Sequence, residues 1–268
     1  MRKNFLNFVD KNDKFFLENG TYVLDCTRIK NGEELSFDHS KHLEVLLTNI
    51  EAVSKLNLFF DDNSSVNVKL IASKDLKDLE INGEIGRNCE ISLYFADFST
   101  NSANVDINYL LKHEGSKFDC YVASLASQKD VKKFVINATN EVGQTSTYIK
   151  NVGVAKDRSL LSFKGASTIA EKAAKSKARQ SSRIVVFDEN SKGFAEPHLN
   201  IYNNDVEASH GATVGKISDS EIFYLMSRGL TLEQSRELIT KSCLKPILNG
   251  FSEPSLIEQI SQLIEERV

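Results

Sequence analysis

Hydrophobic and polar residues alternate along most of the chain, in short runs that recur at nearly regular intervals. Alternation with a period of two is typical of a strand that buries one face and exposes the other to water. Such runs begin near Leu43, Leu56, Val66, Leu79, Ile91, Val105, Phe118, Phe134, Ser146 and Leu160, and successive starts are 10 to 16 residues apart. The pattern predicts a mainly β region from about residue 42 to residue 202.

Two architectures accommodate strands of this length and spacing. A sandwich or meander would join them by hairpins, and the Asn82-Gly83 pair, a strong signal for a tight turn, favours that arrangement. A right-handed parallel β-helix would stack them as successive rungs around one long core. The spacing alone leaves both architectures open.

Two segments depart from the alternating pattern. Residues 1–40 hold short apolar pieces separated by Asn19-Gly20 and Asn31-Gly32, which predict short strands joined by tight turns. Residues 168–179 are rich in alanine and lysine, which are good helix formers, so intrinsic propensity predicts a helix there. The basic side chains of this second segment have no aromatic residues among them, so a solvated face is the plainer interpretation than a phosphate site.

After residue 217 the spacing of apolar residues becomes helical. Ser218 and Glu221 are placed to form a capping box at the start of a first helix, which Gly229 would end in the left-handed conformation. Thr231 and Gln234 predict the same box ahead of a second helix. A proline ends that helix near residue 245, and a third helix is expected from about residue 252.

The composition excludes several classes of function. The net charge of −4 argues against a general binder of nucleic acid or anionic membranes. The four cysteines, at positions 26, 89, 120 and 243, lack the close spacing of a zinc site or a disulfide framework, so we expect buried thiols in a reducing compartment. No run approaches the ~20 apolar residues of a membrane helix, and the first residues lack the features of a secretory signal. Together these features predict a soluble, cytoplasmic protein.

The run Gly211–Lys216, GATVGK, invites comparison with a phosphate-binding loop. That loop needs four residues between its glycines and a Ser or Thr after its lysine. Here three residues intervene and Ile217 follows, so we expect no ATP site in this chain. The small residues from Ser209 to Gly215 predict a tight turn around His210 instead, because glycine permits a positive φ or a close backbone approach.

Several motifs occur in the order in which one known family has them. They are Pro197-His198-Leu199-Asn200-Ile201, Asp205-Val206, SHGATVGKI from Ser209, EIFYL from Glu221 and SRGL from Ser227, with Phe163-Lys164-Gly165 and Ala178-Arg179-Gln180 upstream. This set resembles the SufB/SufD family, the scaffold subunits of the SUF iron–sulfur cluster assembly machinery, and its SufD version most closely. The resemblance covers roughly the last 110 residues.

The resemblance implies a fold and a division of the chain. The SufB/SufD core is a parallel β-helix, which decides between the two architectures and implies that residues 168–179 form rungs rather than a helix. We expect a short N-terminal segment at 1–40, the β-helix core at 41–217 and a small C-terminal helical subdomain at 218–268. The helical N-terminal domain usual in SufD is expected to be absent or reduced to the first segment.

The resemblance also singles out His210. The histidine of this SufD motif lies at the SufB–SufD interface, where nascent clusters are thought to assemble, and neutral imidazole is a suitable ligand for iron. Glu196, His198 and Asp205 would assist if the rungs bring them together. The plainer alternative is a histidine that only satisfies backbone groups at a strand-to-helix corner. SufB-type chains carry a cysteine, whose thiolate would bind iron, at the position of Ser191, so this chain is SufD-like and is not expected to build a cluster alone.

Partners follow from the family as well. The resemblance implies that the helical subdomain docks the ATPase SufC through Phe223, Tyr224, Leu225, Arg228, Gly229 and Leu230. The implied function is a non-enzymatic scaffold subunit of the SufBCD complex that pairs with a SufB-type subunit, or with a second copy as a homodimer, and that holds a transient iron–sulfur cluster at the partner interface. The family complex is also associated with reduced flavin, but nothing in this sequence identifies a flavin site.

Two alternatives come from other classes of protein. A β-helix enzyme acting on polysaccharide would need acidic and basic groups aligned on neighbouring rungs, and it would commonly stack sugars on tryptophan, which the chain lacks. A purely structural β-helix homodimer would handle neither iron nor an ATPase.

Overall fold

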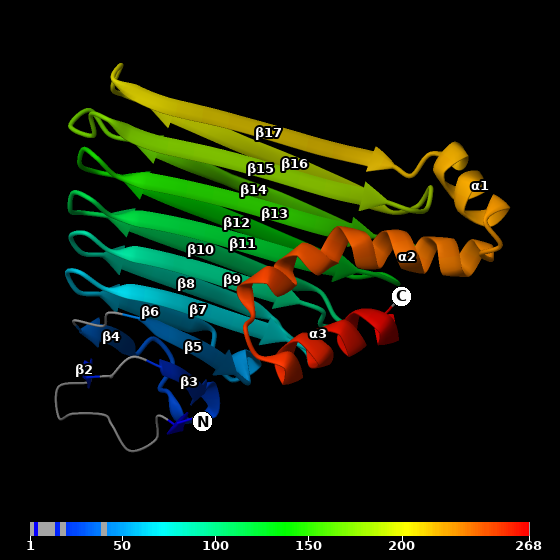
Figure 1. Ribbon diagram of the computed structural model, residues 1–268, viewed down its shortest axis with the longest axis horizontal. Helices are drawn as coiled ribbons and strands as arrows, with labels where there is room; N and C mark the ends of the chain where they lie inside the picture. The colour runs from blue at the N-terminus through cyan, green and yellow to red at the C-terminus, as the bar shows by residue number, and fades with distance from the viewer. Residues whose placement is uncertain (1–2, 5–13, 17–19, 39–41, 268) are drawn as a thin grey trace.

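The computed structural model describes residues 3–4, 14–16, 20–38 and 42–267. Its strands form two sheets, and helices follow them in the sequence (Figure 1). The odd sheet contains, in spatial order, β1 (Lys3–Asn4), β3 (Gly20–Asp25), β5 (Leu43–Thr48), β7 (Ser65–Ala72), β9 (Glu90–Asp97), β11 (Lys117–Ala126), β13 (Ser146–Ala155), β15 (Ser176–Val186) and β17 (Val206–Lys216). The even sheet contains β2 (Lys14–Phe16), β4 (Glu34–Asp38), β6 (Lys55–Phe60), β8 (Asp78–Ile85), β10 (Ala103–Leu111), β12 (Val131–Asn140), β14 (Leu160–Ile169) and β16 (Lys192–Ile201).

The two sheets together make a parallel β-helix. Consecutive strands belong to opposite sheets, and each pairs in parallel with the strand two places along the chain, as β13 does with β15 from Ser146↔Lys177 to Ala155↔Val186. Each turn of the chain therefore adds one rung to both sheets. The expected β-helix is confirmed, and the sandwich alternative is wrong. All ten alternating runs are strands, and each strand starts within three residues of its expected position.

The core lies between the sheets and is filled by the inward-facing residues of each strand. In β12, for example, Phe134, Ile136 and Ala138 are buried, and the residues between them are more exposed. The inward row of β12 also includes a charged residue, Lys132. Lys132 Nζ lies 2.9 Å from Asp97 Oδ2, and both side chains are fully buried. The Lys132 ammonium also donates a hydrogen bond to the Ser99 carbonyl oxygen at 2.9 Å.

The Asn82-Gly83 pair lies inside strand β8, so the hairpin turn expected there is wrong. Gly83 faces the core, where the ring of Tyr109 from the next rung rests on it. A β-carbon at Gly83 would come within 2.1 Å of Tyr109 Cε1. Glycine is therefore required here for close packing between rungs rather than for a turn.

Residues 168–179 contain no helix. They complete β14, turn at 171–174 and begin β15. Ala173 is fully buried at this corner, and Lys175 adopts a left-handed φ of 59°. Small side chains fit the crowded corner, and the pairing of both flanking strands outweighs intrinsic helix propensity. The rungs that the family resemblance implied are confirmed.

The described part of residues 1–40 joins the same two sheets. β3 pairs with β5, and β4 pairs with β6. Asn31 and Gly32 form a turn, and Gly32 has a φ of 78°. Asn19 lies outside the described residues.

Three helices follow β17 in the described chain: α1 (Asp219–Ser227), α2 (Leu232–Leu244) and α3 (Pro254–Arg267), with a 3-10 segment η4 (Lys245–Gly250) between the last two. The two capping boxes are present as expected, at Ser218 and at Thr231. Gly229, with a φ of 96°, follows the end of α1. No helix in the described ranges is long and apolar enough to cross a membrane.

Residues 232–267, which we call the helical strap, lie across the outer face of the odd sheet (Figure 1). Apolar strap residues such as Leu244 and Ile260 pack in one cluster with outward residues of the sheet such as Leu125 and Val154. Polar contacts also hold the strap, and one of them is a salt bridge of 3.5 Å between Arg236 of α2 and Asp188, just after β15. Ser252 donates to Glu44 on β5 at 2.6 Å, and Arg267 forms a salt bridge of 3.2 Å with Asp130, just before β12.

Candidate functional site

The β-helix ends in two adjacent edge strands, β16 and β17. They contain ten and eleven residues, and within the described chain no further strand pairs with either one beyond β14 and β15. Most of their residues are exposed. We call the end of the β-helix formed by these two strands the open end (Figure 1). Long edge strands carry unpaired N–H and C=O groups, which makes them ready templates for another chain.

The SHGATVG run lies within β17, so the tight turn expected there is wrong. Gly211 and Gly215 do not adopt the left-handed conformation. The run pairs with β15 without interruption, from Ser176↔Val206 to Val186↔Lys216. His210 is consequently a mid-strand residue and not part of a strand-to-helix corner.

His210 belongs to the inward row of β17 and is nevertheless exposed. Its register partner is Gln180, which is buried between the sheets. Gln180 Nε2 donates to Ser167 Oγ at 2.6 Å and to the His198 carbonyl at 3.2 Å. His210 occupies the equivalent position one rung further along, where no described rung covers it. The imidazole therefore faces out of the open end, over the axis of the β-helix.

The acids and the histidine expected near His210 do not join it. Glu196 and His198 lie on the outward row of β16, and Glu196 forms a 2.8 Å salt bridge with Lys164. Asp205 lies in the turn before β17, where its carbonyl accepts a 2.6 Å hydrogen bond from Lys175 N. Among the described residues, no three His, Cys, Asp or Glu side chains gather closely enough to hold a metal ion.

Helix α1 stands beside the open end and exposes apolar side chains. All nine of its residues are described and none is buried. Phe223 is 73% exposed, Tyr224 56% and Met226 45%. Arg228 lies over the Tyr224 ring at 5.2 Å, and Leu225 and Leu230 are half-buried. Exposed apolar helix faces of this kind are typical of protein–protein contact surfaces.

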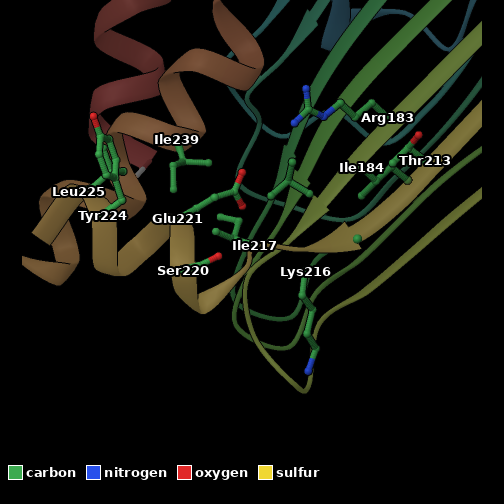
Figure 2. A pocket seen from close by; sticks show the side chains of 12 residues that line it. Arg183, Ile184, Thr213, Lys216, Ile217, Ser220, Glu221, Tyr224, Leu225 and Ile239 are labelled. Carbon is green, nitrogen blue, oxygen red and sulfur yellow. The ribbon is translucent and has the colours of Figure 1, made fainter.

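A cavity of about 470 Å³ separates α1 from the odd sheet (Figure 2). Its walls are Arg183, Ile184 and Val185 of β15, residues 213 and 215–217 at the end of β17, Ser220, Glu221, Tyr224 and Leu225 of α1, and Ile239 of α2. The side chain of Lys216 points away from it (Figure 2). Sequence reasoning did not find Arg183 or Ile239, because only the fold brings them next to β17.

Comparison with known proteins places the chain in a family. The family model for "SUF system FeS cluster assembly, SufBD core domain" matches residues 21–243. The chain belongs to the SufBD family. The match starts well before the motifs that carried the resemblance, because the rungs that precede them belong to the same domain.

Two of the relatives that this SufBD protein matches are SufD proteins, so it is SufD-like. It is 36% identical over 121 residues to the iron–sulfur cluster assembly protein SufD of Bacillus subtilis, which covers 45% of this chain and 28% of the relative. It is 27% identical over 149 residues to SufD of Escherichia coli, covering 52% and 35%. A SufBD family protein of Staphylococcus saprophyticus is 25% identical over 139 residues, covering 52% and 30%. The matches thus span about a third of each relative.

The cysteines of this SufBD protein are core residues. All four are buried, and burial raises the pKa of each thiol, to about 12 at Cys26. Ser191 is also buried, and its hydroxyl donates to the Asp188 carbonyl at 2.8 Å. A thiolate ligand at the open end is therefore missing from the described residues.

Proposed function

We propose that this chain is a SufD-type scaffold subunit of the SUF machinery, and that it pairs with a SufB-type subunit through its open end. The open end is the observation that carries the proposal, since β16 and β17 end both sheets together. A second β-helix placed against them would extend both sheets by main-chain hydrogen bonds. Membership of the SufBD family supports the choice of partner.

His210 is proposed to be the contribution of this chain to a cluster-assembly site at that interface. It is an exposed imidazole on the inward row of the last rung, where a partner's last rung would face it. The cluster would be cargo held between two subunits, and the partner would supply the thiolate ligands that this chain lacks. The chain would serve as a cytoplasmic scaffold with no catalytic activity of its own.

Helix α1 is proposed to dock the ATPase SufC. Phe223, Tyr224 and Met226 expose apolar side chains outside the β-helix core. The helix follows directly after β17, so movement of a docked ATPase would act on the edge strand of the interface. ATP-driven closure of SufC would in this way open or tighten the assembly site.

Co-purification with SufB-type and SufC-type proteins, followed by anaerobic iron–sulfur reconstitution, tests the proposal. We expect a three-component complex whose cluster yield falls when His210→Ala is introduced. His198→Ala is the matched control, because that histidine lies on the outward row of β16. A complex with unchanged yield in His210→Ala would limit this chain to a structural role, and no complex at all would refute the proposed function.

A further inference from the structure

Two glycines of β17 are not required by anything in the described chain. Gly211 and Gly215 lie in regular strand without a left-handed φ. A β-carbon added at either position would meet no atom within 4 Å. Glycine inside a strand lowers stability, and it often marks a place where a ligand or another backbone approaches closely. A backbone or ligand that would require these two glycines is therefore expected from another molecule.

The two glycines face the side on which α1 lies. Because His210 belongs to the inward row, its neighbours Ser209 and Gly211, and then Thr213 and Gly215, form the outward row of β17. Thr213 and Gly215 line the cavity between α1 and the odd sheet. The outer face of the edge strand is therefore cleared of large side chains at the point where the cavity opens.

Arg183 places an unpaired charge at the same corner, which is the outer face of β17 where it borders the cavity. It lies on β15 in direct register with Thr213, is exposed, and makes no hydrogen bond or salt bridge to any residue that the structure describes. Glu221 is near enough for Arg183 to help lower its pKa, but the capping box with Ser218 is the main cause of that shift. The guanidinium is thus available to a carboxylate from outside.

We propose that a strand of a different polypeptide extends the odd sheet beyond β17 and sets two outward side chains in this corner. One is a carboxylate beside Thr213 that pairs with Arg183. The other, two residues away and beside Gly215, is a long side chain that enters the cavity. Directly opposed residues on neighbouring strands share a face at a separation of about 5 Å. The carboxylate would therefore lie two strands, or about 10 Å, from the backbone of Arg183, and the two long side chains together span that distance. This inference rests on the proposed pairing and specifies its chemistry.

A second copy of this chain fits the corner less well. The acid on its own outward row is Glu207, which is already held by Lys177 at 2.8 Å and by Arg179 at 3.4 Å. The remaining outward residues of β17 are Ser, Thr or Gly and are too short to fill the cavity. The corner therefore favours a heterologous partner strand.

Calorimetric titration with the SufB-type subunit of the same organism tests this inference. Arg183→Glu and Gly215→Trp are each expected to raise Kd at least about tenfold, with Arg183→Lys retaining most of the affinity. Arg158→Glu, an exposed residue in the turn between β13 and β14, is the matched charge reversal away from the open end. Thermal unfolding of the isolated variants should match the wild type, because Arg183 is exposed and Gly215 has open space around it.

The outcomes separate this inference from the function on which it rests. Wild-type binding with unchanged affinity in both variants would refute the corner contacts and leave the pairing intact. Absence of wild-type binding would refute both. Self-association of the chain alone that Arg183→Glu abolishes would show that the partner strand is a second copy, against the proposal.

Discussion

The ring of Tyr109 lies on the backbone of Gly83, one rung away, so closely that a β-carbon would approach the ring to 2.1 Å. We expect Gly83→Ala to destabilise the fold by about 2–3 kcal/mol, because the core must overpack or shift. The double variant Gly83→Ala/Tyr109→Leu should recover part of that loss. Urea denaturation measures both.

Gly211→Ala is the control for this pair. It adds the same methyl group to a strand glycine that has open space around it, and we expect it to be neutral or to stabilise the isolated chain by about 0.5 kcal/mol. Equal destabilisation by both alanines would show that strand glycines act through the backbone and not through the Tyr109 contact.

Removing one partner of the buried pair Lys132–Asp97 should destabilise the fold strongly, whereas replacing both partners together should destabilise it little. Lys132→Met leaves the Asp97 carboxylate uncompensated in the core, and we expect a loss of about 3–5 kcal/mol. Replacing both residues by apolar ones of similar volume should restore most of the stability. Chemical denaturation of Lys132→Met and of the double variant measures both effects. Lys55→Ala, which breaks an exposed pair with Glu80, should cost less than about 1 kcal/mol.

Stability should fall at alkaline pH because of the buried thiols. Burial raises the pKa of Cys26 from 9.0 to about 12. Between these values the unfolded chain has lost the thiol proton and the folded chain keeps it, so unfolding is favoured as the pH rises. The stability that the protonated Cys26 thiol contributes is fully present below pH 9.0 and decreases by up to about 1.4 kcal/mol per pH unit above it. Urea titrations at rising pH should show a shallower decline in Cys26→Ala, and an unchanged slope would contradict the shift.

The proposed docking of the ATPase SufC to α1 should depend on the exposed face of that helix. We expect Phe223→Glu to abolish co-purification with SufC without changing the melting temperature, since the Phe223 side chain is 73% exposed. Leu238→Glu places the same charge on an exposed position of α2 and serves as the comparison. Equal binding by wild type and Phe223→Glu would remove α1 from the docking surface.

The sequence predicted the strands and the helix ends because both leave local signals. Period-two alternation marked strands such as Val105 to Leu111, and capping boxes marked Ser218 and Thr231. Two of its errors arose at glycines that lie inside regular strands. Gly83 makes room for Tyr109, and the glycines of β17 interrupt no pairing, yet local rules read both as turns.

The candidate site was only partly predictable for a related reason. His210 stood out through family resemblance, but its orientation depends on the register with Gln180, which alternation alone does not give. The cavity beside α1 joins Arg183, Thr213 and Ile239 from three elements. No local pattern relates such residues before the fold is known.

The helical strap has a consequence for how this scaffold can change in length. Its contacts lie at fixed heights, with Ser252 at β5 and Arg267 at the turn before β12. A helix has a fixed rise of about 1.5 Å per residue, so it cannot stretch to follow a longer stack. A rung inserted between the two contacts would move one of them by about 4.8 Å, whereas a rung added ahead of β5 would move neither. The strap therefore fixes the number of rungs between β5 and β12, whereas evolution can add or remove rungs on the side of β5 away from the open end without moving either contact.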